Sequence, residues 1–94
     1  MNFGQTIEAM KNGKKVARDG WNGKGMFIYL VEGGAVEYRN LRGNAAKHIT
    51  NESTGKPFAA CINSHFDMRT ADGSVAVGWL ASQADMLAED WQIV

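Results

Sequence analysis

Hydrophobic positions near the N-terminus have the spacing of a short amphipathic helix. Phe3, Ile7 and Met10 recur at i, i+4 and i+7, which places them on one face of an α-helix. Asn2 can cap this helix, and Gln5 three positions later can return the hydrogen bond of a capping box. The pattern therefore predicts an N-terminal helix that packs one apolar stripe against the rest of the fold.

Two strands are predicted after this helix, with a glycine-rich segment between them. The first covers residues 15–18, and the second is the run Met26-Phe27-Ile28-Tyr29-Leu30-Val31. A strand with one exposed face would alternate apolar and polar residues, whereas this run is apolar at every position. We therefore expect both of its faces to be covered, one by the helix and the other by a second subunit.

The dipeptide Asp72-Gly73 predicts a β-hairpin with a two-residue type I′ turn. That register turns six side chains toward the core: Phe66, Met68, Thr70, Val75, Val77 and Trp79. The opposite face then carries Asp67 and Arg69 beside small residues, which predicts an open, polar recess.

Signals for a second helix and a closing strand follow the hairpin. Ser82 and Asp85 have the spacing of a capping box, which predicts a short helix through about residue 88. Residues 90–94 are predicted to form the last strand. Trp79 and Trp91 are expected to be core residues.

The middle of the chain has no clear periodicity. Residues 40–56 are polar and rich in turn formers, so we expect a long loop there with a helical turn near 45–48. The predicted fold class is α+β. It consists of a small antiparallel sheet with an N-terminal helix and a short C-terminal helix, in a single domain over residues 1–94 whose variable loop covers about 40–60.

Composition narrows the possible functions. Ten Lys and Arg balance ten Asp and Glu, so the formal net charge is zero. Duplex-DNA binders normally carry a basic excess, and we therefore expect no DNA partner. No apolar run reaches the ~20 residues of a membrane span, and no signal peptide is evident, so a cytoplasmic protein without a membrane partner is expected.

The small size of the chain affects its assembly. A chain of 94 residues buries only roughly 60–65% of its unfolded surface, so a single core is marginal. The one cysteine, Cys61, cannot form an intrachain disulfide and is expected to be a small buried hydrophobic residue. Association into a homo-oligomer would bury the apolar side chains that a single small core leaves exposed.

The sequence offers no support for catalysis. Cys61 and His65 supply two potential zinc ligands where a site needs three or four. Neither a nucleophile elbow nor a P-loop or dinucleotide fingerprint occurs. We therefore expect no metal, no cofactor and no enzymatic activity.

The glycine-rich loop 19–25 is the best candidate for ligand binding. Trp21 either stacks on a ligand ring as an exposed aromatic plate or folds back as a core anchor, and the residues alone leave both interpretations open. Asn22 could form a hydrogen bond with the edge of a base, and Lys24 could bind a phosphate. Arg69 is either an ion-pair partner of Asp67 or a phosphate clamp, and this choice also stays open.

Three phrases give the chain a family resemblance. GWNGKGMF, TADG and the block WLASQADMLAEDW make it similar to the Thoeris anti-defence protein 2 group of phages and prophages. Gly78 precedes the tryptophan of the last block, where members commonly have proline, and residues 43–60 align with nothing in the group.

The resemblance implies a non-catalytic sponge. Such a protein would sequester cyclic ADP-ribose signals of the glycocyclic type, made by bacterial TIR-domain immune enzymes, in the host cytoplasm. It implies a compact α+β homotetramer with ligand pockets where protomers meet, and cyclic oligonucleotides as a second ligand class at separate sites.

Seven residues supply the groups that such a ligand requires, namely an aromatic plate, hydrogen-bonding side chains and cations. They are Trp21, Asn22, Lys24, Phe27, Arg69, Asp72 and Ser82. Two other functions remain open at this stage: an enzyme that cleaves the signal, and a structural or protein-partner module that inhibits a host immune protein directly.

Overall fold

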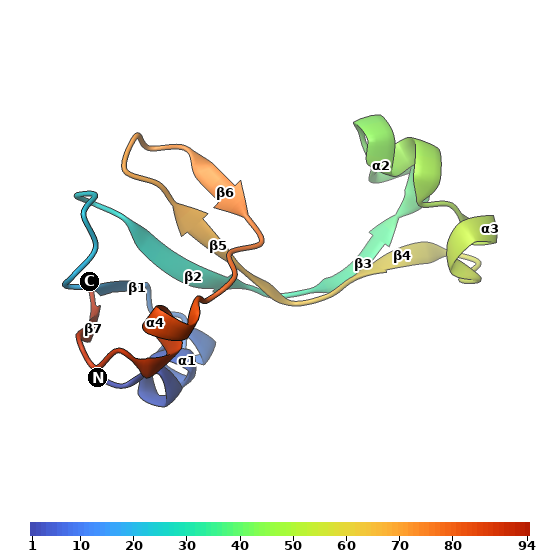
Figure 1. Cartoon of the computed structure of the whole chain (residues 1–94). Helices are drawn as coiled ribbons and strands as arrows, with labels where there is room; N and C mark the ends of the chain where they lie inside the picture. The colour runs from blue at the N-terminus through green and yellow to red at the C-terminus, as the bar shows by residue number, and fades with distance from the viewer. The chain divides into compact units, whose positions relative to one another are not determined.

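The computed structural model describes residues 1–94, which form two compact units (Figure 1). The first unit combines residues 1–31 with residues 65–94, and the second comprises residues 32–64. Helices and antiparallel strands occur together in the chain. The predicted α+β class is therefore confirmed.

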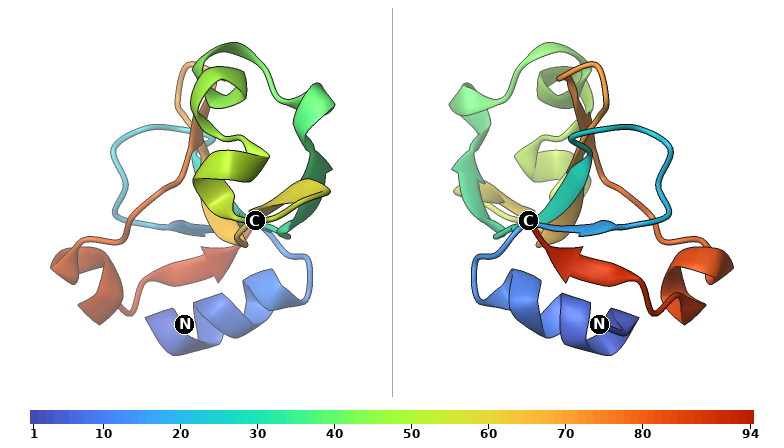
Figure 2. Two further views of the ribbon diagram at one scale, coloured as in Figure 1. Left: turned by 90° about the vertical axis from the view of Figure 1, so that its right-hand side faces the viewer. Right: turned by 90° about the vertical axis from the view of Figure 1, so that its left-hand side faces the viewer.

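The first unit contains a five-stranded antiparallel sheet and two helices. Its elements are α1 (Phe3–Lys11), β1 (Val16–Arg18), β2 (Phe27–Val31), β5 (His65–Arg69), β6 (Val75–Val77), α4 (Gln83–Leu87) and β7 (Trp91–Ile93). The strand order is β6-β5-β2-β1-β7, so the central strand is the apolar β2. In Figure 2, α1 runs alongside β7, the strand that pairs with β1.

Both predicted capping boxes are present. The Asn2 side chain accepts from the backbone N–H of Gln5, and the Gln5 side chain accepts from the backbone N–H of Asn2, each at 2.9 Å. Ser82 and Asp85 make the same exchange at the start of α4. These local hydrogen bonds fix both helix starts as the sequence predicted.

The core of this unit lies between α1 and one face of the sheet. Met10, Val16, Ile28 and Trp91 are 2% exposed or less and pack together. Partly buried apolar side chains surround this cluster, among them Phe3, Ile7, Leu30, Phe66, Met68, Trp21 and Trp79. The expected core positions of Trp91 and of the α1 stripe are confirmed.

The predicted register of the β5–β6 hairpin is wrong by one residue. Thr70 N–H donates to the carbonyl of Ser74, which leaves a three-residue loop, and only Gly73 in this loop has a positive φ, of 91°. A turn whose last loop residue is left-handed glycine shifts the pairing relative to a two-residue type I′ turn. Val75 and Val77, predicted to be buried, are consequently 52% and 74% exposed.

The second unit replaces the long loop expected at residues 40–56. Its elements are β3 (Gly34–Glu37), η1 (Tyr38–Asn40), α2 (Gly43–His48), α3 (Asn51–Thr54) and β4 (Ala59–Ile62). β3 and β4 form a two-stranded antiparallel sheet. Thr50 caps α3, and the Tyr38 hydroxyl donates to the Lys56 carbonyl at 2.6 Å, which closes the segment.

Cys61 lies on β4 and is exposed. The expectation of a buried cysteine is therefore wrong. Its neighbour Ala60, which points the other way on the strand, takes the buried position at 2% exposure.

Candidate functional site

The candidate site lies on the face of the first unit's sheet that points away from the core. In a strand, alternate side chains point to opposite faces. Ile28 of β2 is in the core, so Phe27 and Tyr29 point to the opposite face. Pairing places Arg69 beside Phe27, and Val75 beside Arg69. We call this the open face of the sheet.

A groove of about 480 Å³ runs between the open face and the glycine-rich loop. It is lined by residues of the loop, of β1, β2 and β5, and of the chain's end: Lys15, Ala17, Arg18, Asp19, Trp21, Gly23, Lys24, Gly25, Met26, Phe27, Arg69, Gln92 and Val94. We call it the loop groove. Four residues predicted from the sequence meet there, namely Trp21, Lys24, Phe27 and Arg69.

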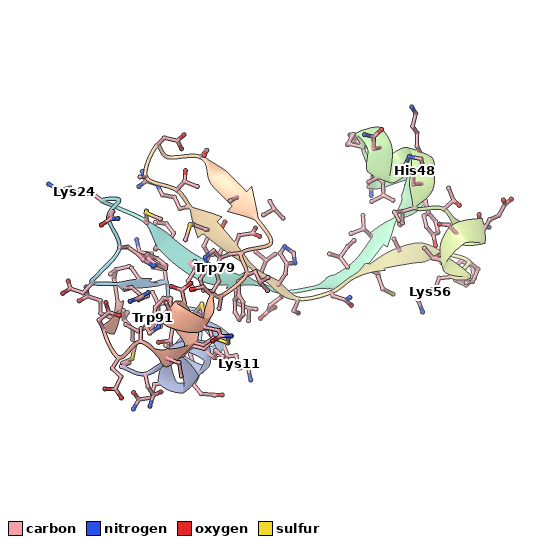
Figure 3. The ribbon with its side chains drawn as sticks, viewed as in Figure 1. Lys11, Lys24, His48, Lys56, Trp79 and Trp91 are labelled. Atoms are coloured by element: carbon pink, nitrogen blue, oxygen red, sulfur yellow. The ribbon has the colours of Figure 1, made fainter.

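Hydrogen bonds hold both ends of the glycine-rich loop. At its start, the N–H of Gly20 donates to Asp90 Oδ2 at 2.8 Å. At its end, Arg69 Nη1 donates to the carbonyl of Gly25 at 2.8 Å. Gly25 has φ of 73°, and a Cβ at this position would lie 2.6 Å from Arg69 Nη1, so only glycine fits without a shift. Lys24 lies at the tip between these anchors and projects away from the sheet (Figure 3).

Arg18 holds Asp90, the residue that accepts the hydrogen bond at the start of the loop. Its guanidinium lies 2.9 Å from Asp90 Oδ1 and 2.9 Å from Asp85 Oδ1. The bond from Arg18 is the main reason that the pKa of Asp90 is below its usual value, with the Gly20 N–H next. Burial by itself would raise the pKa of Asp85, but hydrogen bonds from Ser82 and Arg18 outweigh it and the pKa is lowered. All three groups therefore stay charged at neutral pH.

The position of Trp21 is compatible with both of the interpretations left open by the sequence. Its ring packs edge-on against Trp91 at 5.3 Å and Trp79 at 6.3 Å between centroids. It is only half buried and also lines the loop groove. The tryptophan cluster, labelled through Trp79 and Trp91 in Figure 3, thus supports the loop from the core side.

Asn22, Asp72 and Ser82 do not line this groove. Asn22 is exposed on the loop. Asp72 serves its own turn: it accepts from the Thr70 hydroxyl and from the N–H of Ser74, which together lower its pKa to about 2, the Thr70 bond contributing most. Ser82 is occupied in capping α4. A ligand-binding role for these three residues stays a prediction.

The structure excludes one of the two roles considered for Arg69. It makes no ion pair with Asp67; it bonds the carbonyl of Gly25 instead. Asp67 is 7% exposed and accepts from the N–H of Gly78, with His65 Nε2 at 3.4 Å. The recess expected beside Arg69 is bordered by Val75 rather than by small residues, because of the shifted register.

Several residues around the groove were missed by sequence reasoning. Lys15 holds its Nζ 4.6 Å from the centroid of the Phe27 ring, and Tyr29 lies 6.0 Å from the same ring. Arg18 and Asp90 hold the loop from positions 72 residues apart. Only the alternation along β2 could have indicated that Tyr29 shares a face with Phe27. Nothing local in the sequence indicates the pairing of Arg18 with Asp90.

No three His, Cys, Asp or Glu side chains lie close enough together to hold a metal ion. No helix is long and apolar enough to cross a membrane.

Comparison with known proteins places the chain in a family. A family model described as a Thoeris anti-defence 2-like domain matches residues 1–94, the whole chain. The chain belongs to this family. A protein of Bacillus phage SP01, named Thoeris anti-defense 2, is 37% identical over 94 residues, which cover all of this chain and 94% of the phage protein. The family resemblance seen in the sequence is thus confirmed, and the match extends across residues 43–60, which the sequence phrases had left unaligned. The family's name describes proteins that act against Thoeris immunity.

Proposed function

We propose that this Thoeris anti-defence 2-like protein is a non-catalytic sponge for cyclic ADP-ribose signals. Binding of the signal without cleavage would lower its free concentration and so inhibit Thoeris immunity. The observation that supports the proposal best is the loop groove, because two aromatic side chains and four cationic side chains meet there: Trp21, Phe27, Lys15, Arg18, Lys24 and Arg69.

The groups of the loop groove match those of such a ligand. The rings of Trp21 and Phe27 offer apolar surface to a purine, which is worth about 1–3 kcal/mol when a base stacks. Lys24 and Arg69 offer positive charge to a pyrophosphate. The groove volume of about 480 Å³ lies within the roughly 300–1,000 Å³ typical of small-molecule sites.

The proposal is tested by binding and recovery. The protein is incubated with glycocyclic ADP-ribose, separated from free ligand and denatured by heat, and the released small molecules are analysed by mass spectrometry. Intact ligand in stoichiometric amount supports the sponge. A cleaved product would instead indicate an enzyme, and a protein that retains a host immune protein but no nucleotide would indicate a partner module.

Lys24 gives a matched variant for this test. Its side chain forms no hydrogen bond or ion pair and projects from the loop tip, so Lys24→Gln should leave the fold intact (Figure 3). Loss of one exposed charge contact should weaken ligand binding by up to about fivefold. Lys47→Gln, on α2 of the second unit, is the control and should bind as the parent does.

We also propose a homo-oligomer, a tetramer, acting in the cytoplasm of the host. The open face carries half-buried Tyr29 and exposed Val75 and Val77, which a second copy would cover, so that the grooves of this face would lie where protomers meet. Light scattering at micromolar concentration should give a mass well above 10.3 kDa. Tyr29→Asp should dissociate the assembly, because it would bury an unpaired charge. A monomeric parent would refute this proposal.

Cyclic oligonucleotides are proposed as a second ligand class. A cyclic trinucleotide that binds without displacing glycocyclic ADP-ribose would support separate sites, whereas mutual displacement would contradict them.

A further inference from the structure

A second groove lies next to the loop groove on the open face. Its volume is about 550 Å³. It is lined by Gly13, Lys14, Lys15, Phe27, Tyr29, Arg69, Val75, Ile93 and Val94. Two aromatic rings and three cationic side chains line this sheet groove, and no Asp or Glu side chain does. It therefore suits a ligand that is both apolar and negatively charged.

The two grooves meet at a shared set of side chains. Lys15, Phe27, Arg69 and Val94 line both of them. Phe27 is on β2, which lies between β5 with Arg69 and β1, which follows Lys15. Arg69 is the direct cross-strand partner of Phe27, and Lys15 Nζ lies 4.6 Å from the centroid of its ring. One aromatic ring thus lies between two cations where the grooves join.

Neither Lys15 nor Arg69 forms an ion pair within 4.0 Å. Arg69 uses one guanidinium nitrogen on the carbonyl of Gly25, which holds the side chain in place. Its charge also helps to lower the pKa of Asp72, but without an ion pair between the two groups. Lys15 is exposed and makes only the cation–π contact with Phe27. Two cations without an ion-pair partner on a partly apolar surface attract an anion from solution.

We propose that Lys15 is a further ligand-binding residue, and that it and Arg69 together hold the pyrophosphate of one ligand whose purine occupies the loop groove and whose ribose rings occupy the sheet groove. This inference rests on the proposed function, since it assigns the part of the nucleotide that each groove receives. It makes the loop groove and the sheet groove two lobes of a single site.

Binding of glycocyclic ADP-ribose to Lys15→Gln tests the inference, measured by calorimetry at several salt concentrations. Affinity should fall about tenfold, which corresponds to about 1.4 kcal/mol. The loss should shrink as salt rises, because screening weakens a charge contact but not a packing contact. Lys15→Arg should restore most of the affinity. Lys11→Gln, which removes a lysine from α1 outside both grooves, should bind as the parent does.

Pyrophosphate separates failure of this inference from failure of the proposed function. In an NMR titration, pyrophosphate alone should shift the signals of Lys15 and Arg69. If the parent binds the cyclic nucleotide and Lys15→Gln binds it equally well, the inference about Lys15 is overturned, whereas the proposed sponge function is supported. If the parent binds no cyclic nucleotide but pyrophosphate shifts these signals, the proposed sponge function is refuted and the anion site at Lys15 and Arg69 is supported. No response to either probe overturns both.

Discussion

Trp21 illustrates how one residue can serve the core and a surface together. One side of its indole packs against the tryptophans that follow the hairpin and α4, and the other side borders the loop groove. The loop anchors Gly20 and Gly25 lie on either side of it in the sequence. The ring therefore holds the loop at a fixed distance from the sheet, and a change at this position should affect both stability and binding.

Replacing Trp21 by alanine should lower the free energy of unfolding by about 2–3 kcal/mol. A fully buried aromatic residue costs about 3–5 kcal/mol on truncation, and Trp21 is only half buried. Denaturant unfolding measures the loss. Trp21→Phe keeps an aromatic ring in the cluster and should lose less, whereas Trp91→Ala, at 2% exposure, should lose more. A Trp21→Ala protein as stable as the parent would contradict the core role.

The carboxylates around the site predict how stability depends on pH. The pKa values of Asp90, Asp85 and Asp72 lie below those of the unfolded chain, which are about 3.9. The folded protein therefore binds fewer protons than the unfolded one in acid. Their stabilisation is fully present above about pH 4 and is lost as pH falls through the lowered values. The melting temperature should accordingly stay constant near neutral pH and fall steadily below about pH 4.

Asp90→Asn isolates one of these contributions. The amide keeps the shape but loses the charge that Arg18 and the Gly20 N–H face, so the melting temperature at pH 7 should drop and its fall in acid should be smaller. Asp19→Asn removes the same charge from an exposed side chain without a hydrogen-bond partner and should change neither quantity. Equal behaviour of the two variants would show that Asp90 does not anchor the loop.

At the scale of elements, local signals in the sequence were sufficient for the helix starts and failed for the turn. Asn2 with Gln5, and Ser82 with Asp85, act within one helical turn, so their spacing alone fixed the caps. The Asp72-Gly73 pair fits two turn geometries whose registers differ by one residue. In the observed register the N–H of Gly78 donates to the buried Asp67 carboxylate, a contact across the hairpin that local spacing does not reveal.

In the second unit, the helical turn expected near residues 45–48 lies within α2, but the full extent of α2 and the whole of α3 were not predicted. Neither α2 nor α3 has a buried residue, so no apolar stripe marks them. α3 is set by a Thr50–Ser53 capping exchange and ends at Gly55 with φ of 75°. The candidate site was predicted in part by its aromatic and basic residues, but Lys15, Arg18 and Asp90 join it only through strand pairing.

Gly73→Ala tests the observed turn. With φ of 91° at this position, a side chain should cost about 1–2 kcal/mol of stability. Gly4→Ala is the control of opposite sign: it lies within α1, where its Cβ would meet only ordinary contact at 3.5 Å, and it should stabilise by about 0.5–1 kcal/mol. Thermal unfolding of both variants against the parent measures the difference. A Gly73→Ala protein as stable as Gly4→Ala would refute the turn geometry.

At the scale of the whole molecule, the second unit is an insertion between two paired strands. Val31, the last residue of β2, is the cross-strand partner of His65, the first residue of β5. The two strands would form an ordinary hairpin if a short turn joined them. The loop groove and the sheet groove are lined only by residues of the first unit.

Replacement of residues 32–64 by Asn-Gly should therefore leave the first unit folded. A two-residue type I′ turn suits strands that end as a directly opposed pair. The shortened protein should keep a cooperative melting transition and the nucleotide affinity of the parent. A shortened chain that folds but no longer binds would place part of the site in residues 32–64, and one that does not fold would show that the first unit depends on them.

The pairing of β1 with β7 has a consequence for the order of folding. Val16 pairs with Ile93, and the Met1 ammonium donates to the Trp91 carbonyl at 2.7 Å, so these contacts join opposite ends of the sequence. Closing a loop of this length costs entropy before any contact compensates for it, and non-local pairing slows folding. β7 is the last strand of the sheet in sequence order, so β1 can gain its second neighbour only after every other strand of the sheet has been synthesised. The tryptophan cluster includes Trp91 of β7, so it and the loop that it supports can be completed only when β7 is present.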